Sequence, residues 1–273
     1  MTDKYAVIGN PIAHSKSPLI HATFARATGA DLTYEALLAP LDGFTAAVRA
    51  FFAAGGRGVN VTVPFKQEAY ALADEAADSA RNARAANVLD YRAGRIIAHN
   101  TDGAGLLRDL TNNLGCVLRH RRVLLMGAGG ASWGVAGPLL EAGPLKFTIA
   151  NRTADKAVAL ARHFTRAGAP CTPVATTYAE LAGCTFDVII NATSAGLADA
   201  MPALPEGVVT HGTYAYDMVY GKQTPFMRYA RERGARVVDG TGMLVEQAAE
   251  SFYIWRGVRP DTAAVIAMLR SEE

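Results

Sequence analysis

The chain has 273 residues, of which 50% are hydrophobic and 19% are charged, a composition that provides a well-buried core and argues against disorder. Its 27 basic and 25 acidic residues give a net charge of +2, so we expect neither a nucleic-acid partner nor a membrane surface. The three cysteines are widely spaced, which argues against a disulfide framework or a zinc site, and no apolar segment has the length of a signal peptide or a membrane span. We therefore expect a soluble cytoplasmic protein without a metal.

Strand and helix signals alternate through the first hundred residues. Short β-branched or apolar runs predict strands at 5–9, 32–37, 59–63, 88–91 and 95–98. Periodic apolar positions predict helices at 17–28, 43–54 and 66–80. The last two strands flank Arg92-Ala93-Gly94, which favours a hairpin. Strands that alternate with helices indicate a mainly parallel sheet covered by helices.

A second α/β domain is predicted after a connecting helix at 103–114, whose Leu106, Leu110 and Leu114 share one face. It begins with a strand at 122–126, a glycine-rich turn and a helix to about 141. Further strands are expected at 147–150, 187–192, 214–218 and 236–238, and helices at 243–255 and after Pro260. We place the domains at 1–102 and 103–242, and expect the helices of 243–273 to pack back on the first domain.

Residues 60–66, NVTVPFK, are the most informative segment of the first domain. Asn60 and Thr62 alternate with valines, and Pro64 removes a backbone donor, so the strand must end or lie at a sheet edge there. Polar side chains near the carboxyl end of a strand, followed by Lys66, suit a small polar ligand. The alternative is an edge strand with a solvated lysine.

The glycine-rich turn, Gly127 to Ser132, lies between a strand and a helix, which is the context of a dinucleotide site. Gly127 permits the tight turn, and Gly129 allows a pyrophosphate to approach the backbone at the helix N-terminus. Ser132 stands where glycine or alanine is usual, which weakens the match. A purely structural turn is the alternative.

The end of the next strand favours NADP over NAD. An acidic residue would bind an NAD ribose there, but the chain has Arg152, whose planar guanidinium suits a 2′-phosphate, with Thr153 and Lys156 as further donors. The structural alternative is that Thr153 caps the following helix, and this role is compatible with phosphate binding.

Asp102 and Lys66 each follow a strand end, and we expect them to form an ion pair that serves proton transfer. For Asp102 the alternative is an ordinary helix N-cap. Ser15 and Ser17 precede a helix and suit a carboxylate, unless Ser17 only caps that helix. Neither His14 nor Ser194 has the neighbours that serine catalysis requires.

Nine segments together resemble the shikimate dehydrogenase family, in the family's order, between residues 5 and 255. They are GNPIAHSKSPLIH (9–21), NVTVPFK (60–66), AANVL (85–89), NTDGAG (100–105), GAGGAS (127–132), NRTADK (151–156), NATSAG (191–196), YDMVY (216–220) and DGTGMLVEQAA (239–249). The resemblance implies an N-terminal substrate domain, a Rossmann-type NADP domain, and reversible NADPH-linked reduction of 3-dehydroshikimate to shikimate in aromatic amino acid and chorismate biosynthesis.

The resemblance also implies roles for individual residues. Lys66 would transfer the proton, paired with Asp102. The implied substrate-binding residues are Ser15, Ser17, Asn60, Thr62, Lys66, Asn87, Asp102, Tyr220 and Gln247. The implied cofactor-binding residues are Gly127, Ala128, Gly129, Gly130, Ala131, Asn151, Arg152, Thr153, Lys156, Thr193, Ser194, Met218, Gly240 and Met243.

Two positions depart from the family pattern. Trp133 stands where an arginine commonly follows the glycine loop, which removes a cation from the adenosine-phosphate site, although the ring could stack on adenine. Ala22 replaces a frequent asparagine. The alternatives are a quinate/shikimate dehydrogenase, against which Arg152 and the serine pair count, and a catalytically silent NADP-binding sensor, which would need neither Lys66 nor Asp102. We expect a small-molecule substrate and a monomer or homodimer.

Overall fold

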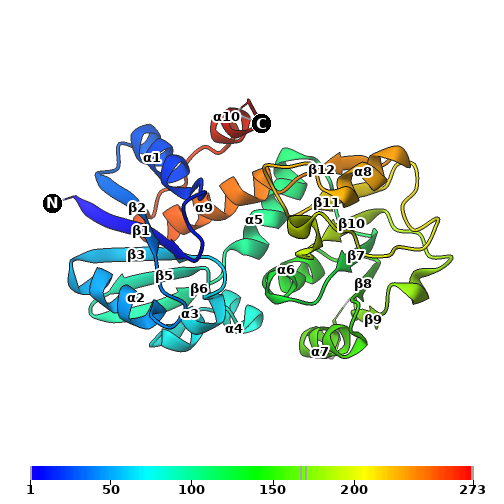
Figure 1. Ribbon diagram of the computed structural model, residues 1–273, viewed down its shortest axis with the longest axis horizontal. Coiled ribbons are helices and arrows are strands. Elements are labelled where there is room, and N and C mark those ends of the chain that lie inside the picture. The colour runs from blue at the N-terminus through cyan, green and yellow to red at the C-terminus, as the bar shows by residue number, and fades with distance from the viewer. Residues whose placement is uncertain (1, 167, 170, 272–273) are drawn as a thin grey trace. The chain divides into compact units, whose positions relative to one another are not determined.

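The computed structural model describes residues 2–166, 168–169 and 171–271 and consists of two compact units, each with its own sheet (Figure 1). The first unit comprises the residues up to Gly105 together with Val245–Met268. The second comprises Leu106–Leu244 and the stretch from Leu269. Both are α/β, so the predicted fold class is confirmed.

The sheet of the first unit has the strand order β2-β1-β3-β5-β6-β4. Its strands are β1 (Asp3–Gly9), β2 (Leu32–Leu38), β3 (Gly56–Val61), β4 (Glu75–Ala76), β5 (Val88–Arg92) and β6 (Arg95–His99). Its helices are α1 (Ser17–Thr28), α2 (Phe44–Ala53), α3 (Lys66–Leu72) and α4 (Asp78–Ala83). β1 pairs in parallel with β2 and β3, whereas β5 runs antiparallel to both β3 and β6. The expected hairpin is therefore present, and Ala93 and Gly94 both have the positive φ of a tight β-turn.

β3 lies in the interior of this sheet and ends at Val61, before Pro64. Val59 and Val61 are buried in the core of the unit, as the alternation predicts. Val63 is exposed instead, because the strand has already ended. Asn60 points away from the valines and is buried in a polar cluster described below.

The prediction of a single helix at 66–80 is wrong. The segment forms α3, then the short strand β4, then α4. The backbone at Ala73 is extended, and the Asp74 carboxylate accepts a hydrogen bond from the backbone N–H of Ile96 (2.7 Å). The alanine-rich composition favours a helix locally, but pairing of β4 with β6 overrides it.

The second unit contains a six-stranded sheet of order β12-β11-β10-β7-β8-β9, in which every pair is parallel. The strands are β7 (Arg122–Met126), β8 (Lys146–Ala150), β9 (Val174–Thr176), β10 (Val188–Asn191), β11 (Tyr214–Asp217) and β12 (Arg236–Val238). The helices are α6 (Gly130–Glu141), α7 (Ala154–Phe164) and α8 (Pro225–Glu232). The chain runs outward from β7 in one direction and then returns to the other side at β10. That reversal makes the carboxyl ends of β7 and β10 the expected ligand crevice of such a sheet.

Two helices link the units. α5 (Asp102–Arg108) leads from the first unit into the second and continues as a π-helical turn, Asp109–Asn113. α9 (Thr241–Arg256) leads back, and its Trp255 ring stacks on Tyr5 in the first unit at 4.7 Å between centroids. The final helix, α10, begins at Ala263 and not directly after Pro260. The Ala263 backbone N–H donates a hydrogen bond to Asp261 Oδ1. Across the described residues, every helix falls short of the length and apolarity needed to cross a membrane.

Candidate functional site

Lys66 and Asp102 form a close ion pair in the first unit. Lys66 begins α3 and Asp102 begins α5, and Nζ lies 2.5 Å from Oδ2. The Asp102 side chain is 9% exposed and that of Lys66 is 26% exposed, so the lysine remains open to a ligand. Asp102 is the first residue of α5 rather than the residue before it, and its carboxylate oxygens accept hydrogen bonds from Lys66 and Asn87.

Asn87 connects this ion pair to α9. Its Nδ2 lies 2.9 Å from Asp102 Oδ1, 2.9 Å from Thr101 Oγ1 and 3.2 Å from Gln247 Oε1, so its two N–H groups are shared among three acceptors. Its Oδ1 accepts from the backbone N–H of Thr101 (2.8 Å). Asp102 is thus held on one oxygen by the lysine and on the other by an amide, which orients the carboxylate.

Asn60 lies in a second part of the same polar cluster. Its Oδ1 accepts a hydrogen bond from the Tyr34 hydroxyl (2.7 Å), and its Nδ2 donates to Ser251 Oγ (2.9 Å) and to the Asn87 carbonyl (3.3 Å). Ser251 Oγ lies 3.4 Å from Thr101 Oγ1, which joins the two parts of the cluster.

Ser15 and Ser17 lie close together, because Ser15 Oγ accepts a hydrogen bond from the Ser17 backbone N–H (3.3 Å). The Ser17 hydroxyl hydrogen-bonds with Tyr34 and does not cap α1, whose N-cap position is Lys16. Thr62 follows the end of β3 and is partly exposed. Tyr220, in the second unit, is 40% exposed. The structure therefore brings Ser17 and Asn60 to Tyr34, and Asp102 and Gln247 to Asn87, whereas Ser15 and Thr62 take no part in these hydrogen bonds.

The glycine loop of the second unit has the shape that a bound pyrophosphate needs. Gly127 has φ +101°, which favours glycine, and α6 begins directly after Gly129. A Cβ added at Gly129 or Gly130 would meet no atom within 4 Å, so the backbone faces open space at a helix N-terminus. Ser132 is fully buried and its Oγ has no hydrogen-bond partner, so it serves close packing of α6.

Arg152, Thr153 and Lys156 are exposed at the start of α7. Thr153 holds the N-cap position, but its side chain accepts no capping hydrogen bond. Within the described ranges, no carboxylate lies at ion-pair distance from Arg152. The Asn151 side chain donates to the Thr153 carbonyl (2.9 Å), which braces the turn. These donors fit a phosphate, and the residue that follows β8 is Asn151 rather than the carboxylate that would bind an NAD ribose.

Most of the remaining expected cofactor residues follow the ends of neighbouring strands: Thr193 and Ser194 follow β10, Met218 follows β11 and Gly240 follows β12, whereas Met243 lies in α9. A Cβ on Gly127 would come within 3.1 Å of the Thr193 methyl group, so the loops after β7 and β10 are in contact. A Cβ on Gly240 would come within 2.4 Å of the Met218 carbonyl oxygen, so these two backbones also meet. Met243 is buried, whereas Ser194 is exposed.

A buried carboxylate supports the Thr193 loop. Asn191 Oδ1 accepts hydrogen bonds from Thr193 Oγ1 (2.7 Å) and its backbone N–H (3.2 Å), and Asn191 Nδ2 donates to Asp217 Oδ2 (3.1 Å). Thr224 Oγ1 donates to the same oxygen (2.6 Å). Burial raises the pKa of Asp217, against the opposing effect of these donors.

Trp133 packs inside the second unit. Its ring lies 4.9 Å from that of His163 and 6.4 Å from that of Phe164, both on α7. The side chain is therefore part of the contact between α6 and α7, and adenine stacking by Trp133 stays a prediction.

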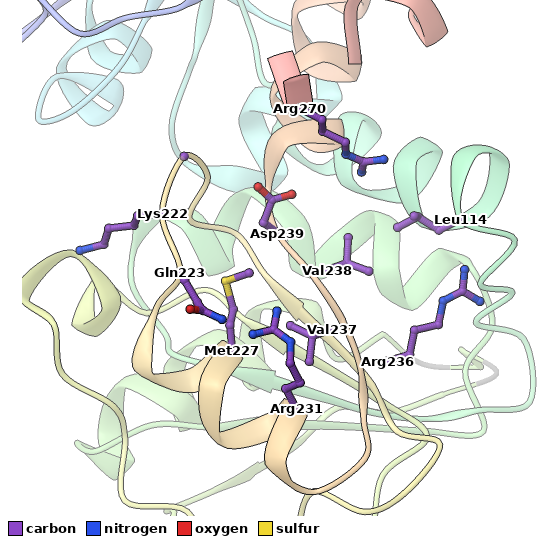
Figure 2. A pocket seen from close by; sticks show the side chains of 11 residues that line it. Leu114, Lys222, Gln223, Met227, Arg231, Arg236, Val237, Val238, Asp239 and Arg270 are labelled. Carbon is purple, nitrogen blue, oxygen red and sulfur yellow. The ribbon is translucent and has the colours of Figure 1, made fainter. Parts of the chain in front are cut away.

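A cavity of about 570 Å³ lies elsewhere in the second unit, around β12 (Figure 2). It is basic: Lys222, Arg231, Arg236 and Arg270 are among its lining residues. Its Asp239 carboxylate accepts hydrogen bonds from the Thr241 hydroxyl and backbone N–H. No site residue expected from the sequence lines it.

The pattern of motifs matches models of one family over most of the chain. Residues 7–89 match the shikimate dehydrogenase substrate binding domain, residues 109–199 match shikimate/quinate 5-dehydrogenase, and residues 240–270 match the shikimate 5′-dehydrogenase C-terminal domain. The chain belongs to the shikimate dehydrogenase family.

Relatives of this family resemble the chain along its whole length. A shikimate dehydrogenase (NADP(+)) of Aromatoleum aromaticum is 59% identical and covers 99% of this chain and 98% of its own. The crystal structure of an Ael1 enzyme from Pseudomonas putida is 52% identical, with a TM-score of 0.94 over 98% of both chains. Shikimate 5-dehydrogenase from Thermus thermophilus, solved with NADP(H) and shikimate, is 34% identical, with a TM-score of 0.86 over 100% of both chains.

Three members of the polar cluster were not expected from the sequence. Thr101 lies inside NTDGAG, next to Asp102, and Ser251 lies one helical turn after Gln247. Tyr34 lies in a strand whose alternation is weak, and only its pairing with β1 in the fold brings its hydroxyl to Asn60.

Proposed function

We propose that the chain catalyses the NADPH-linked, reversible reduction of 3-dehydroshikimate to shikimate. Family membership supports the reaction class, and one observation in the site supports it further. An accessible lysine is held by a nearly buried aspartate at 2.5 Å, inside a cluster rich in hydroxyl and amide groups.

In this proposal, Lys66 moves the proton. In the oxidation of shikimate, the reacting hydroxyl gives its proton to the Lys66 amine, and in the reverse direction the ammonium donates it to the carbonyl oxygen. Asp102 orients the lysine through the 2.5 Å ion pair. NADP supplies the hydride acceptor when bound. Ser15, Ser17 and the amides of the cluster would hold the substrate carboxylate and hydroxyl groups.

We propose that the cofactor binds the second unit. The open backbone after Gly127, the N-terminus of α6 and the exposed Arg152 fit a dinucleotide with a 2′-phosphate. The other cofactor residues named above would complete the site around the nicotinamide. We also propose domains at 1–102 and 103–242, with residues 243–273 returning to the first domain. We propose further that the protein is cytoplasmic and is a monomer or a homodimer. Light scattering after size exclusion measures the oligomeric state.

A single assay separates this function from its alternatives. Formation of the reduced cofactor is followed with shikimate and with quinate, as NADPH with NADP and as NADH when NAD replaces it. We expect the highest kcat/KM with shikimate and NADP. Equal use of quinate, or a preference for NAD, would favour a quinate/shikimate dehydrogenase, and turnover with neither acid would leave only the sensor.

The role of Lys66 is tested by Lys66→Ala, with Lys4→Ala as the control, since Lys4 is an exposed lysine in β1 of the same unit. We expect Lys66→Ala to lower kcat by roughly 100-fold or more, the usual contribution of a positioned acid–base group. Shikimate affinity, measured by calorimetry, should change much less. Retained turnover in Lys66→Ala would remove the lysine from the mechanism.

A further inference from the structure

We propose that Tyr34 is a positioning residue for substrate recognition, because its single hydroxyl couples Ser17 to Asn60. This inference rests on the proposed function, since it assigns a task within the same substrate site. Tyr34 lies on β2, outside every motif that identified the family, and it contacts the site only through other side chains.

The Tyr34 hydroxyl joins two residues that are 43 positions apart in sequence. The hydroxyl donates to Asn60 Oδ1 at 2.7 Å, and the Ser17 hydroxyl hydrogen-bonds with the Tyr34 oxygen. Burial raises the pKa of Tyr34 well above 10, so the hydroxyl stays protonated and remains a donor. Ser17 and Asn60 are both expected to contact the substrate, so one phenol oxygen supports two contact points.

The Asn60 amide has a defined orientation because of its partners. The Asn87 carbonyl can only accept a hydrogen bond, so Nδ2 must face it, and the second Nδ2 proton goes to Ser251 Oγ. Tyr34 takes one of the two lone pairs of Oδ1. Because both Nδ2 protons are engaged, Asn60 can offer a substrate only an acceptor, which suits a hydroxyl rather than a carbonyl or a carboxylate.

The Tyr34 ring is held by aromatic neighbours. It stacks on the His21 ring at 4.2 Å between centroids and 5° between planes, and Trp255 lies 6.5 Å away. Burial lowers the pKa of His21 to about 3, although the Asn60 side chain opposes that shift, so the imidazole is neutral at physiological pH. Removing only the hydroxyl therefore leaves the ring in place and tests the hydrogen bonds alone.

The test is Tyr34→Phe, with Tyr5→Phe as the matched control. Tyr5 is the register partner of Tyr34 on β1 and is also packed by Trp255, but its hydroxyl hydrogen-bonds with Arg256. We expect Tyr34→Phe to raise the KM for shikimate by roughly 2- to 12-fold, the worth of one hydrogen bond. The KM for NADP and the kcat should change by less than about 2-fold. Tyr5→Phe should leave all three parameters unchanged.

A double-mutant cycle identifies the route of the effect. If Tyr34 acts through Asn60, adding Tyr34→Phe to Asn60→Ala should raise the KM for shikimate by less than about 2-fold, and the same non-additivity should hold with Ser17→Ala. Full additivity in both backgrounds, or a lower melting temperature with an unchanged KM, would overturn the inference. If the wild-type chain does not turn over shikimate, the proposed function fails and this inference fails with it, whereas turnover with an unaltered KM in Tyr34→Phe refutes the inference alone.

Discussion

His21 should make the stability of the first unit depend on pH. It is 1% exposed, and the groups around its ring are aromatic: Tyr34, Phe24, Phe252 and Trp255. Burial, which outweighs the opposing effect of the Asn60 side chain, lowers its pKa from 6.5 to about 3. Between pH 6.5 and about pH 3, His21 is protonated in the unfolded chain and neutral in the folded chain. Stability is therefore fully present above pH 6.5 and is lost as the pH falls toward 3.

The size of the effect follows from the two pKa values. From about pH 8 to about pH 5, one such histidine removes about 2 kcal/mol from the free energy of unfolding. His21→Phe keeps an aromatic ring against Tyr34 and deletes the titration. The difference in stability between the variant and the wild type should therefore shift by about 2 kcal/mol in favour of the variant across that range.

Urea unfolding followed by tryptophan fluorescence measures this difference. The chain has two tryptophans, and Trp133→Phe as a common background leaves Trp255, which lies 5.6 Å from His21, to report on the first unit. His99, whose pKa burial also lowers, is present in both proteins and cancels. The free energy of unfolding of the variant is compared with that of the wild type at each pH. If this difference stays constant within about 0.5 kcal/mol from pH 8 to pH 5, His21 is not held neutral by the fold.

Three further predictions concern packing and the cofactor. Gly105→Ala should destabilise the first unit by about 1–3 kcal/mol and weaken shikimate binding, because its Cβ would lie 2.7 Å from the backbone nitrogen of Gln247, as urea unfolding and calorimetry would show. Thr224→Val should lower the free energy of unfolding by about 1–3 kcal/mol, since it leaves the buried Asp217 carboxylate without its 2.6 Å donor; an unchanged urea midpoint would contradict this. Arg152→Ala should raise the KM for NADP by roughly 10- to 150-fold while the KM for NAD stays nearly constant, and equal changes for both cofactors would exclude recognition of the 2′-phosphate.

Much of the fold follows from local sequence patterns. The strands at 122–126 and 236–238 were predicted to the residue, because β-branched and apolar runs end there at clear turn signals. α8 was missed although its start has a readable cap: the Thr224 side chain accepts from the Met227 backbone N–H (3.2 Å), with proline as the first helical residue. β4 was missed because two paired residues leave no periodicity to detect.

Some residues of the candidate site could be predicted from the sequence and others could not. Residues inside dense motifs, such as Lys66 and Asp102, were predicted as a pair because each follows a strand end, and the structure places them 2.5 Å apart. Tyr34 and Ser251 were not predicted, because their roles arise from contacts with Asn60 over 26 and 191 positions of sequence. Such contacts depend on the assembled sheet and on α9, and no local pattern encodes them.

The discontinuity of the first unit bears on how the chain is made. Most of this unit leaves the ribosome first, yet Gln247, Ser251 and Trp255 belong to it and are translated near the end. Until they emerge, Asn60 lacks its Ser251 partner, Asn87 lacks its Gln247 partner, and Tyr5 lacks the ring that covers it. The half of the protein that is synthesised first thus cannot complete its contacts until α9 has been made, by which time the whole sheet of the second unit, Arg122–Val238, has already been translated.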